Sequence, residues 1–201
     1  MRLANKRYNE IKRTVADLFE DYDVRTIPID VFGLAEKMGI EIVFASKCNR
    51  NCLMDYFDNV ESCVAYNDVL QKYVVYLDDV NTGKKRQKFS LAHEIIHIVL
   101  NHKDQSKYNE SEANFGAAYL LCPTSLAILS SAEELMLSTE GIQSIFDVSL
   151  GLAKIAARHN KKRLANVRRG PADYESRINS LLKESLFARI HGFVNKNPCH
   201  S

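Results

Sequence analysis

Apolar residues recur at helical spacing through the first forty positions of the chain. Within residues 7–20 they fall three and four positions apart and predict an amphipathic helix, with an apolar face of Ile11, Val15, Leu18 and Phe19. Pro28 is expected to open a second, short helix, which Gly39 ends. The apolar face of this second helix comprises Val31, Leu34, Ala35 and Met38.

Three segments that follow are rich in β-branched and aromatic residues. They are Ile40 to Ala45, Cys63 to Tyr66 and Lys72 to Asp78, and the last two are separated by the turn signal Asn67-Asp68. Because short strands joined by tight turns pair with opposite directions, the pattern predicts a small antiparallel sheet.

Helical spacing returns in the rest of the chain. Asn81-Thr82-Gly83 offers an N-cap for a helix over 84–101, and a second helix should cover 110–121 until Pro123 stops it. A group of helices should fill 131–190, punctuated by Gly141, Gly151 and Pro171. Helices therefore outnumber strands, and the expected fold class is α+β.

The composition is that of an ordinary globular protein. With 201 residues, 46% hydrophobic and 26% charged, the chain has enough apolar material for one or two domains. Charges are spread through Met1 to Asp21, which lacks the apolar core of a signal peptide. No stretch approaches the roughly 18 apolar residues that span a bilayer, so we expect a cytoplasmic protein.

The net charge and the cysteine content argue against two classes of protein, a nucleic-acid binder that is basic overall and a disulfide-bonded protein. A net charge of +2 is too small for the whole molecule to bind nucleic acid electrostatically, so such binding would need a local patch. Five cysteines at irregular spacing favour reduced thiols over a disulfide framework. A metal site at Cys48, Cys52 and Cys63 is the lesser alternative, because the spacing is loose and no histidine lies near.

The segment His93-Glu94-Ile95-Ile96-His97 has the H-E-x-x-H pattern inside a predicted helix. Four residues at ~100° each place the two imidazoles about 40° apart on one helical face, where both can bind one zinc ion. Glu94 lies near enough to take a proton from a water that the metal activates. The alternative is that the two histidines serve only packing or helix capping. However, burying these polar groups without partners among the surrounding apolar residues would cost free energy.

Catalytic zinc usually takes three protein ligands, and the third should come from a neighbouring element. Glu110 is the preferred candidate and Glu112 the second choice. If Glu112 has no role in the site, we expect it to be a charge that faces solvent. Asn114, one turn after Glu110, is expected to hydrogen-bond a ligand histidine and fix its tautomer. His102 would lie about 180° from His93 on a continuous helix, so it is expected to be a surface or capping residue.

These residues resemble those of the ImmA/IrrE family of bacterial metallopeptidases. The resemblance rests on the block from Arg86 to His97 (RQKFSLAHEIIH), the block from Glu110 to Pro123 (ESEANFGAAYLLCP) and the strand Tyr73 to Leu77, and it covers roughly residues 7–165. The family pattern has Gly where Ile96 stands and Met where Cys122 stands. Both replacements are compatible with the predicted metal site.

The resemblance implies a zincin-like, gluzincin-type site in which His93, His97 and Glu110 bind zinc and Glu94 is the catalytic base. It implies an intracellular endopeptidase, often encoded near phage or mobile-element genes, that cleaves a helix-turn-helix transcriptional repressor and so regulates transcription. It also implies that residues 73–77 form a sheet edge to which an extended substrate adds. The corresponding division is a metallopeptidase domain over 1–128, a helical C-terminal region over 129–195 and a tail over 196–201.

The C-terminal region resembles a helix-turn-helix unit. The residues that carry this resemblance are Ile142, Ile145, Phe146, Val148, Ser149, Leu152, Ala153 and Ile155. Basic residues follow it closely: Arg158, Lys161, Lys162, Arg163, Arg168 and Arg169. They offer contacts to DNA phosphates, although such a run is more often a solvated face, and recognition of a repressor protein is an equal alternative.

Two other functions compete with the peptidase. The first is a regulatory module that binds protein or DNA, such as one half of a toxin–antitoxin or immunity pair, but a pure binder does not need Glu94. The second is a structural zinc protein, which would prefer four ligands richer in cysteine. The residue that stabilises the oxyanion stays open among Tyr66, Tyr73, Tyr76, Tyr108, Tyr119 and His102.

Overall fold

The computed structural model describes residues 3–48, 60–129, 133–166 and 170–196. These residues form two compact units, each drawn from two stretches of the chain. The first unit takes the described residues up to Thr14 and those of Val31–Ala117, and the second takes Val15–Asp30 and those from Ala118 onward. The sequence-based division at 128/129 follows chain order instead, and it stays a prediction.

The two N-terminal helices agree with the apolar spacing. α1 covers Asn5–Asp21 and buries its predicted apolar face. α2 covers Val31–Lys37, so it begins three residues after Pro28 and not at that proline. Gly39 follows with φ of +70°, a left-handed conformation that glycine adopts without strain and that ends the helix.

The first unit contains a three-stranded mixed sheet of β1 (Glu41–Phe44), β2 (Ser62–Asn67) and β3 (Lys72–Leu77), in the order β1-β3-β2. β2 and β3 pair antiparallel as predicted, but β1 pairs parallel to β3. The antiparallel expectation is wrong for β1, because a long connection leads from it to the other strands and no tight turn fixes its direction. The expectation that 73–77 forms an edge is also wrong, since β3 is the central strand.

α4 (Lys84–Val99) contacts β2, β3 and α2. Its N-cap is Gly83, without a hydrogen bond from a side chain. This residue belongs to the tripeptide from which the N-cap was expected, and the Thr82 hydroxyl of the same tripeptide donates to the carbonyl of Asp78.

α5 (Lys107–Leu121) begins three residues earlier than predicted and carries Glu110 in its first turn. α5 ends two residues before Pro123, and the 3-10 helix η2 (Thr124–Ile128) begins directly after this proline. Cys122 is buried, which fits its expected role as an apolar filler.

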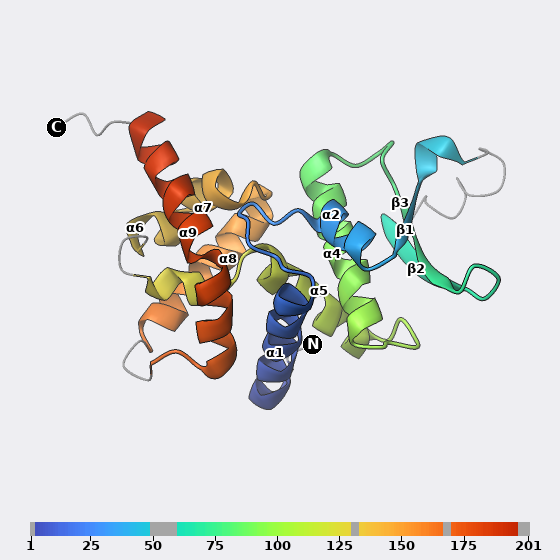
Figure 1. Cartoon of the computed structure of the whole chain (residues 1–201), viewed down its shortest axis with the longest axis horizontal. Helices are drawn as coiled ribbons and strands as arrows, with labels where there is room; N and C mark the ends of the chain where they lie inside the picture. Colours follow the sequence, from blue (N-terminus) through green and yellow to red (C-terminus); the bar gives the residue numbers. More distant parts are fainter. Residues whose placement is uncertain (1–2, 49–59, 130–132, 167–169, 197–201) are drawn as a thin grey trace. The chain divides into compact units, whose positions relative to one another are not determined.

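The second unit is helical in its C-terminal stretch, with α6 (Glu133–Leu137), α7 (Thr139–Phe146), α8 (Leu150–Leu164) and α9 (Asp173–Lys196) (Figure 1). Gly141 and Gly151 lie inside helices and do not separate them. A Cβ at Gly141 would lie 2.3 Å from the carbonyl oxygen of Leu135, so close packing explains this glycine. None of the described helices is long and apolar enough to cross a membrane.

Candidate metal centre

His93 and His97 lie one turn apart on α4 and turn the same ring atom toward a common point. Their Nε2 atoms are 3.0 Å apart. Glu110 approaches from α5, with its two carboxylate oxygens 3.3 Å from His93 Nε2 and 3.3 Å from His97 Nε2. The two helices therefore bring these three side chains together, as the sequence predicted.

The spacing of the three donors fits a tetrahedral metal site. Zinc–nitrogen and zinc–oxygen bonds of about 2.0–2.2 Å place neighbouring ligands in a tetrahedral site roughly 3.3 Å apart. The Nε2–Nε2 separation of 3.0 Å and the two separations of 3.3 Å, each to a different Glu110 oxygen, lie close to this value, and the three donor atoms lie within 4.8 Å of one another. Among the described residues, His93, His97 and Glu110 are the group of histidine, cysteine and acidic side chains that can hold a metal ion.

Both histidines are poised as neutral rings. Burial lowers the pKa of His93 to about 4, although a hydrogen bond with the Asn114 side chain opposes this. Burial and the neighbouring His93 lower the pKa of His97 to about 4. A neutral imidazole offers a lone pair to a metal at neutral pH. Asn114 makes the predicted contact with His93, and its side-chain nitrogen also donates to the Glu110 carbonyl at 2.7 Å.

Glu94 lies beside the donor atoms and is 5% exposed. The Ser62 hydroxyl of β2 donates to its carboxylate at 2.7 Å. Burial raises the pKa of Glu94 to about 7, and the nearby Glu110 charge adds to this rise while the Ser62 hydrogen bond opposes it. The carboxyl group can therefore gain and lose a proton near neutral pH, which is the property of a general base.

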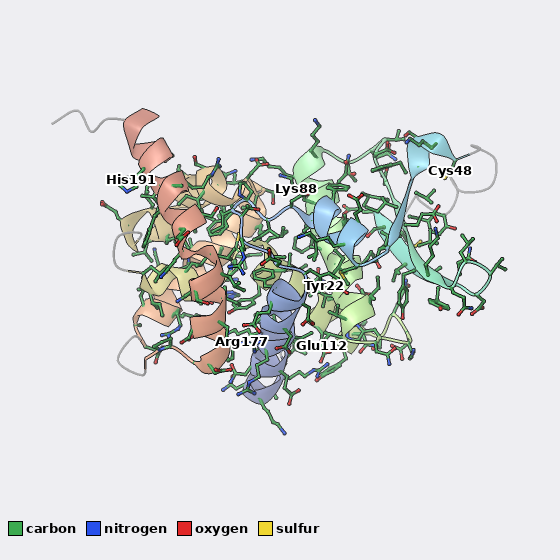
Figure 2. All side chains as sticks on the ribbon, viewed as in Figure 1. Tyr22, Cys48, Lys88, Glu112, Arg177 and His191 are labelled. Atoms are coloured by element: carbon green, nitrogen blue, oxygen red, sulfur yellow. The ribbon has the colours of Figure 1, made fainter. Side chains whose placement is uncertain are left out.

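Glu112 and His102 depart from their sequence-based expectations. Glu112, labelled in Figure 2, is 1% exposed and binds Arg7 of α1, so it is not a solvent-facing charge, and it does not belong to the group of described side chains that can hold a metal ion. The His102 side chain is 5% exposed, and its Nδ1 lies 2.9 Å from His97 Nδ1. The expectation of a surface histidine is therefore wrong for the side chain, although the backbone of His102 does take part in capping α4.

The end of α4 explains how His102 returns to the site. The helix ends at Val99, and Asn101 takes a left-handed conformation with φ of +54°. The backbone N–H of His102 then donates to the His97 carbonyl, as in a Schellman cap. The angle of 180° holds only for a continuous helix, and the asparagine after the last periodic residue was the signal that the helix stops.

A cleft with a volume of about 720 Å³ opens onto the three donors and Glu94. Its walls include Ser62 and Val64 of β2, Arg86 and Ser90 of α4, and the segment 102–105. Of the candidates for the oxyanion, His102 lines this cleft, whereas the five tyrosines are not among its lining residues in the described part of the chain.

The cysteine alternative gains no support in the described residues. Cys48 is a half-buried free thiol, and it lies in no group of described side chains that can hold a metal. Cys52 and Cys199 fall outside the described residues, as do Arg168 and Arg169.

Comparison with known proteins defines the class of the chain. Residues 35–160 match the family model Peptidase_M78, described as an IrrE N-terminal-like domain. The match covers more than half of the chain, so the protein belongs to this ImmA/IrrE family of peptidases. No curated protein matches the chain. Membership implies a metallopeptidase-type function with a metal cofactor, and all five residues of the predicted site lie inside the matched region.

Proposed function

We propose that the chain is a zinc-dependent endopeptidase of the H-E-x-x-H, gluzincin-like type that acts in the cytoplasm. The observation that carries this proposal is the convergence of three side chains beside the buried Glu94. His93 Nε2 and His97 Nε2 are 3.0 Å apart, and each lies 3.3 Å from one of the two carboxylate oxygens of Glu110. The ligand set is His93, His97 and Glu110, and Asn114 supports it by its hydrogen bond to His93.

The chemistry of the donors favours zinc. Two neutral imidazoles and one carboxylate are typical of catalytic zinc sites, whereas structural sites close with four ligands that are richer in cysteine. Three protein ligands would leave one coordination position for water or substrate, and the cleft borders all three donor residues. Zinc, when bound there, supplies a Lewis acid that polarises the scissile carbonyl and activates water.

Glu94 is the proposed base. Its carboxylate takes a proton from the attacking water and then delivers it to the leaving amine, which a carboxyl group with a pKa near 7 does in both directions. The Ser62 hydroxyl donates to one oxygen of Glu94 and so restrains the carboxylate within the cleft that borders the donors. Burial of this side chain keeps bulk water from competing for the proton.

The proposed substrate is a protein segment in extended conformation. β2 is an edge strand of the sheet, and its residues Ser62 and Val64 line the cleft. A peptide that adds to β2 would pass beside Glu94, so the proposed site of strand addition moves from 73–77 to β2. A helix-turn-helix transcriptional repressor, encoded near a mobile element, is the proposed natural substrate, and the family resemblance supports it.

A cleavage assay tests this function. A helix-turn-helix repressor encoded beside the gene is incubated with the zinc-loaded protein, and the products are identified by mass spectrometry. We expect one main cut with the wild type and none with Glu94→Gln, which keeps its fold and its zinc. Glu36→Gln, an exposed change on α2, should cleave as the wild type does. Undiminished cleavage by Glu94→Gln would refute the role of the base.

A second candidate function is DNA binding through α6, α7 and α8. These three helices contact one another. α7 and α8 are joined by the three residues 147–149, of which Asp147 is left-handed with φ of +50°. A short turn of this kind between two packed helices is typical of helix-turn-helix units, in which the second helix reads DNA.

The exposed face of α8 suits a polyanion. The helix has no acidic residue, and four of its basic residues are exposed and form no ion pair with another described residue: Lys154, Arg158, Lys161 and Lys162. Arg163 differs, because it binds Glu175 through two hydrogen bonds. Leu150 and Ile155 are 50% and 40% exposed on the same helix and offer apolar contacts to bases.

Fluorescence anisotropy with a random 20-base-pair duplex tests the second function. Four phosphate contacts predict a slope of about −3 to −4 for the logarithm of the association constant against that of salt concentration. Arg158→Ala with Lys162→Ala should weaken binding and reduce the slope by about 2, whereas Lys183→Ala on α9 should not. Binding that is absent at low salt would leave a protein partner as the occupant of this face.

A further inference from the structure

A row of three polar side chains leads away from the metal side of His97. His97 Nδ1 lies 2.9 Å from His102 Nδ1, and His102 Nε2 lies 3.1 Å from Glu112 Oε2. Arg7 completes the row, because its Nε and Nη2 donate to the two oxygens of Glu112 at 2.5 Å each. The row thus joins the end of α4, the first turns of α5 and the start of α1 within the first unit.

The row has only one arrangement of protons that suits a metal ligand. His97 Nε2 faces His93 and Glu110, so a lone pair on this atom requires the proton to sit on Nδ1. His97 Nδ1 then donates to His102 Nδ1, which must accept. His102 therefore carries its proton on Nε2 and donates to Glu112, a carboxylate that only accepts.

Glu112 is held as an anion at the end of this row. Arg7 donates to both of its oxygens, and His102 lies within hydrogen-bond distance of one of them. The carboxylate is 1% exposed, and the Arg7 side chain that neutralises it also binds Glu10. A buried charge of this kind is costly unless it is paired, and each oxygen of Glu112 has a charged donor.

We propose that His102 and Glu112 are positioning residues that fix the ring orientation and tautomer of His97 for metal binding, with Arg7 anchoring Glu112. Such partners behind a ligand histidine raise its basicity and hold its ring, and their removal typically costs 10- to 100-fold in metal affinity. This inference rests on the proposed function of His97 as a metal ligand.

A purely structural role is the competing explanation, because the Arg7–Glu112 pair also ties α1 to α5. Under that explanation, changes in the row would lower stability and leave metal affinity unchanged. Tyr8 offers a matched control, since its ring packs edge-on against Phe115 of α5 with centroids 4.6 Å apart and lies outside the row. Tyr8→Leu weakens the same helix contact without touching His97.

The experiment measures zinc affinity by competition with a chromophoric chelator, beside the unfolding midpoint of each metal-free variant. We expect His102→Phe to bind zinc 10- to 100-fold more weakly, and Glu112→Gln to lose affinity to a smaller extent because its amide still accepts a hydrogen bond. The double variant should bind no more weakly than His102→Phe, because the row acts through His102. The visible spectrum of the cobalt-substituted protein should also shift in His102→Phe and stay unchanged in Tyr8→Leu.

The outcomes separate this inference from the proposed function. Zinc affinity that stays within about twofold of the wild type in a folded His102→Phe would overturn the positioning role alone. Zinc affinity that falls equally in Tyr8→Leu would overturn it too, because loss of helix packing would then explain the effect. A folded wild type that binds no zinc would overturn both the positioning role and the proposed function.

Discussion

Glu94 is a buried acid whose burial has a cost in the metal-free protein. Its pKa rises to about 7, above the ordinary value of 4.5, so the folded state holds a proton that the unfolded chain releases between these two pH values. The stabilisation from this proton is fully present below pH 4.5 and is lost as the pH rises through 7. Metal-free protein at pH 8 therefore carries a buried carboxylate whose ionisation destabilises the fold.

Replacement of this carboxylate should stabilise the metal-free protein at alkaline pH. Glu94→Gln is expected to raise the free energy of unfolding at pH 8, with an upper limit on the order of 3 kcal/mol from the pKa difference. Urea denaturation after chelator treatment measures the change, and Glu36→Gln serves as the exposed control. A Glu94→Gln protein that is less stable than the wild type at pH 8 would contradict this account.

Ser62 should set the pH at which the base becomes active. Its hydroxyl stabilises the ionised form of Glu94, so Ser62→Ala is expected to raise the pKa of Glu94 further. The acidic limb of the profile of kcat/KM against pH should then move to higher pH by on the order of one unit. A limb that stays in place or moves to lower pH would show that the hydroxyl does not stabilise the charged form.

Local sequence was informative for the residues of the site wherever a regular helix carried them. His93, Glu94, His97, Glu110 and Asn114 follow from helical spacing on α4 and α5, and the structure brings them together. His102 could not be placed in this way, because its position depends on the left-handed turn at Asn101. The burial of Glu112 depends on Arg7, which lies 105 residues earlier in the chain, and spacing along one helix cannot reveal such a partner.

At the scale of elements, α4 and α5 are fitted to one another by a pair of residues. Ile96 is fully buried and stands where the family pattern has glycine. It faces Gly116 of α5, where an added Cβ would lie 2.7 Å from Ile96 Cγ2. The missing side chain at 116 therefore makes room for the larger one at 96, and the helix that carries the histidines stays close to the helix that carries Glu110.

The pair should respond as a unit to substitution. Gly116→Ala is expected to destabilise the protein by about 1–3 kcal/mol through overpacking, although alanine is the better helix former by ~1 kcal/mol. Ile96→Ala in the same protein should cost less than Ile96→Ala in the wild type, because the new methyl group fills part of the cavity. Denaturant titrations of the four proteins give the coupling, and a Gly116→Ala protein more stable than the wild type would exclude the contact.

Strand direction marks the limit of prediction for the sheet. The turn at Asn67-Asp68 determines that β2 and β3 run antiparallel, and Asn67 accepts hydrogen bonds from the backbone of Val69 and Leu70 there. β1 has no such local constraint, and its parallel pairing with β3 depends on long-range packing. The sequence therefore predicted where all three strands lie in the chain, but not the direction in which β1 pairs with β3.

At the scale of the whole molecule, the second unit combines the end of α1 with the C-terminal helices. Arg177 of α9 binds Asp17 and Glu20 of α1. Figure 2 shows Arg177 beside α1. The Ile27 backbone N–H donates to the Ser185 hydroxyl at 2.8 Å. Residues near the start of the chain thus belong to the same compact unit as residues near its end, which no local signal indicates.

A fragment that ends at the sequence-based boundary should consequently be unstable. Residues 1–128 lack α6 to α9 but keep the apolar residues of the second unit that α1 contributes, such as Leu18 and Phe19. We expect this fragment to aggregate or to unfold without cooperativity, because these buried side chains would lose their partners. Circular dichroism during thermal unfolding tests this, and a cooperative transition like that of the full chain would support the division at 128/129.

Zinc content decides whether His93, His97 and Glu110 form a metal site. Elemental analysis of the purified wild type, His97→Ala and Glu94→Gln compares the full site with one that lacks a ligand and one that lacks only the base. We expect about one zinc ion per chain in the wild type and in Glu94→Gln, and its loss in His97→Ala. A folded wild type without zinc, or zinc that persists at full content in His97→Ala, would contradict this expectation.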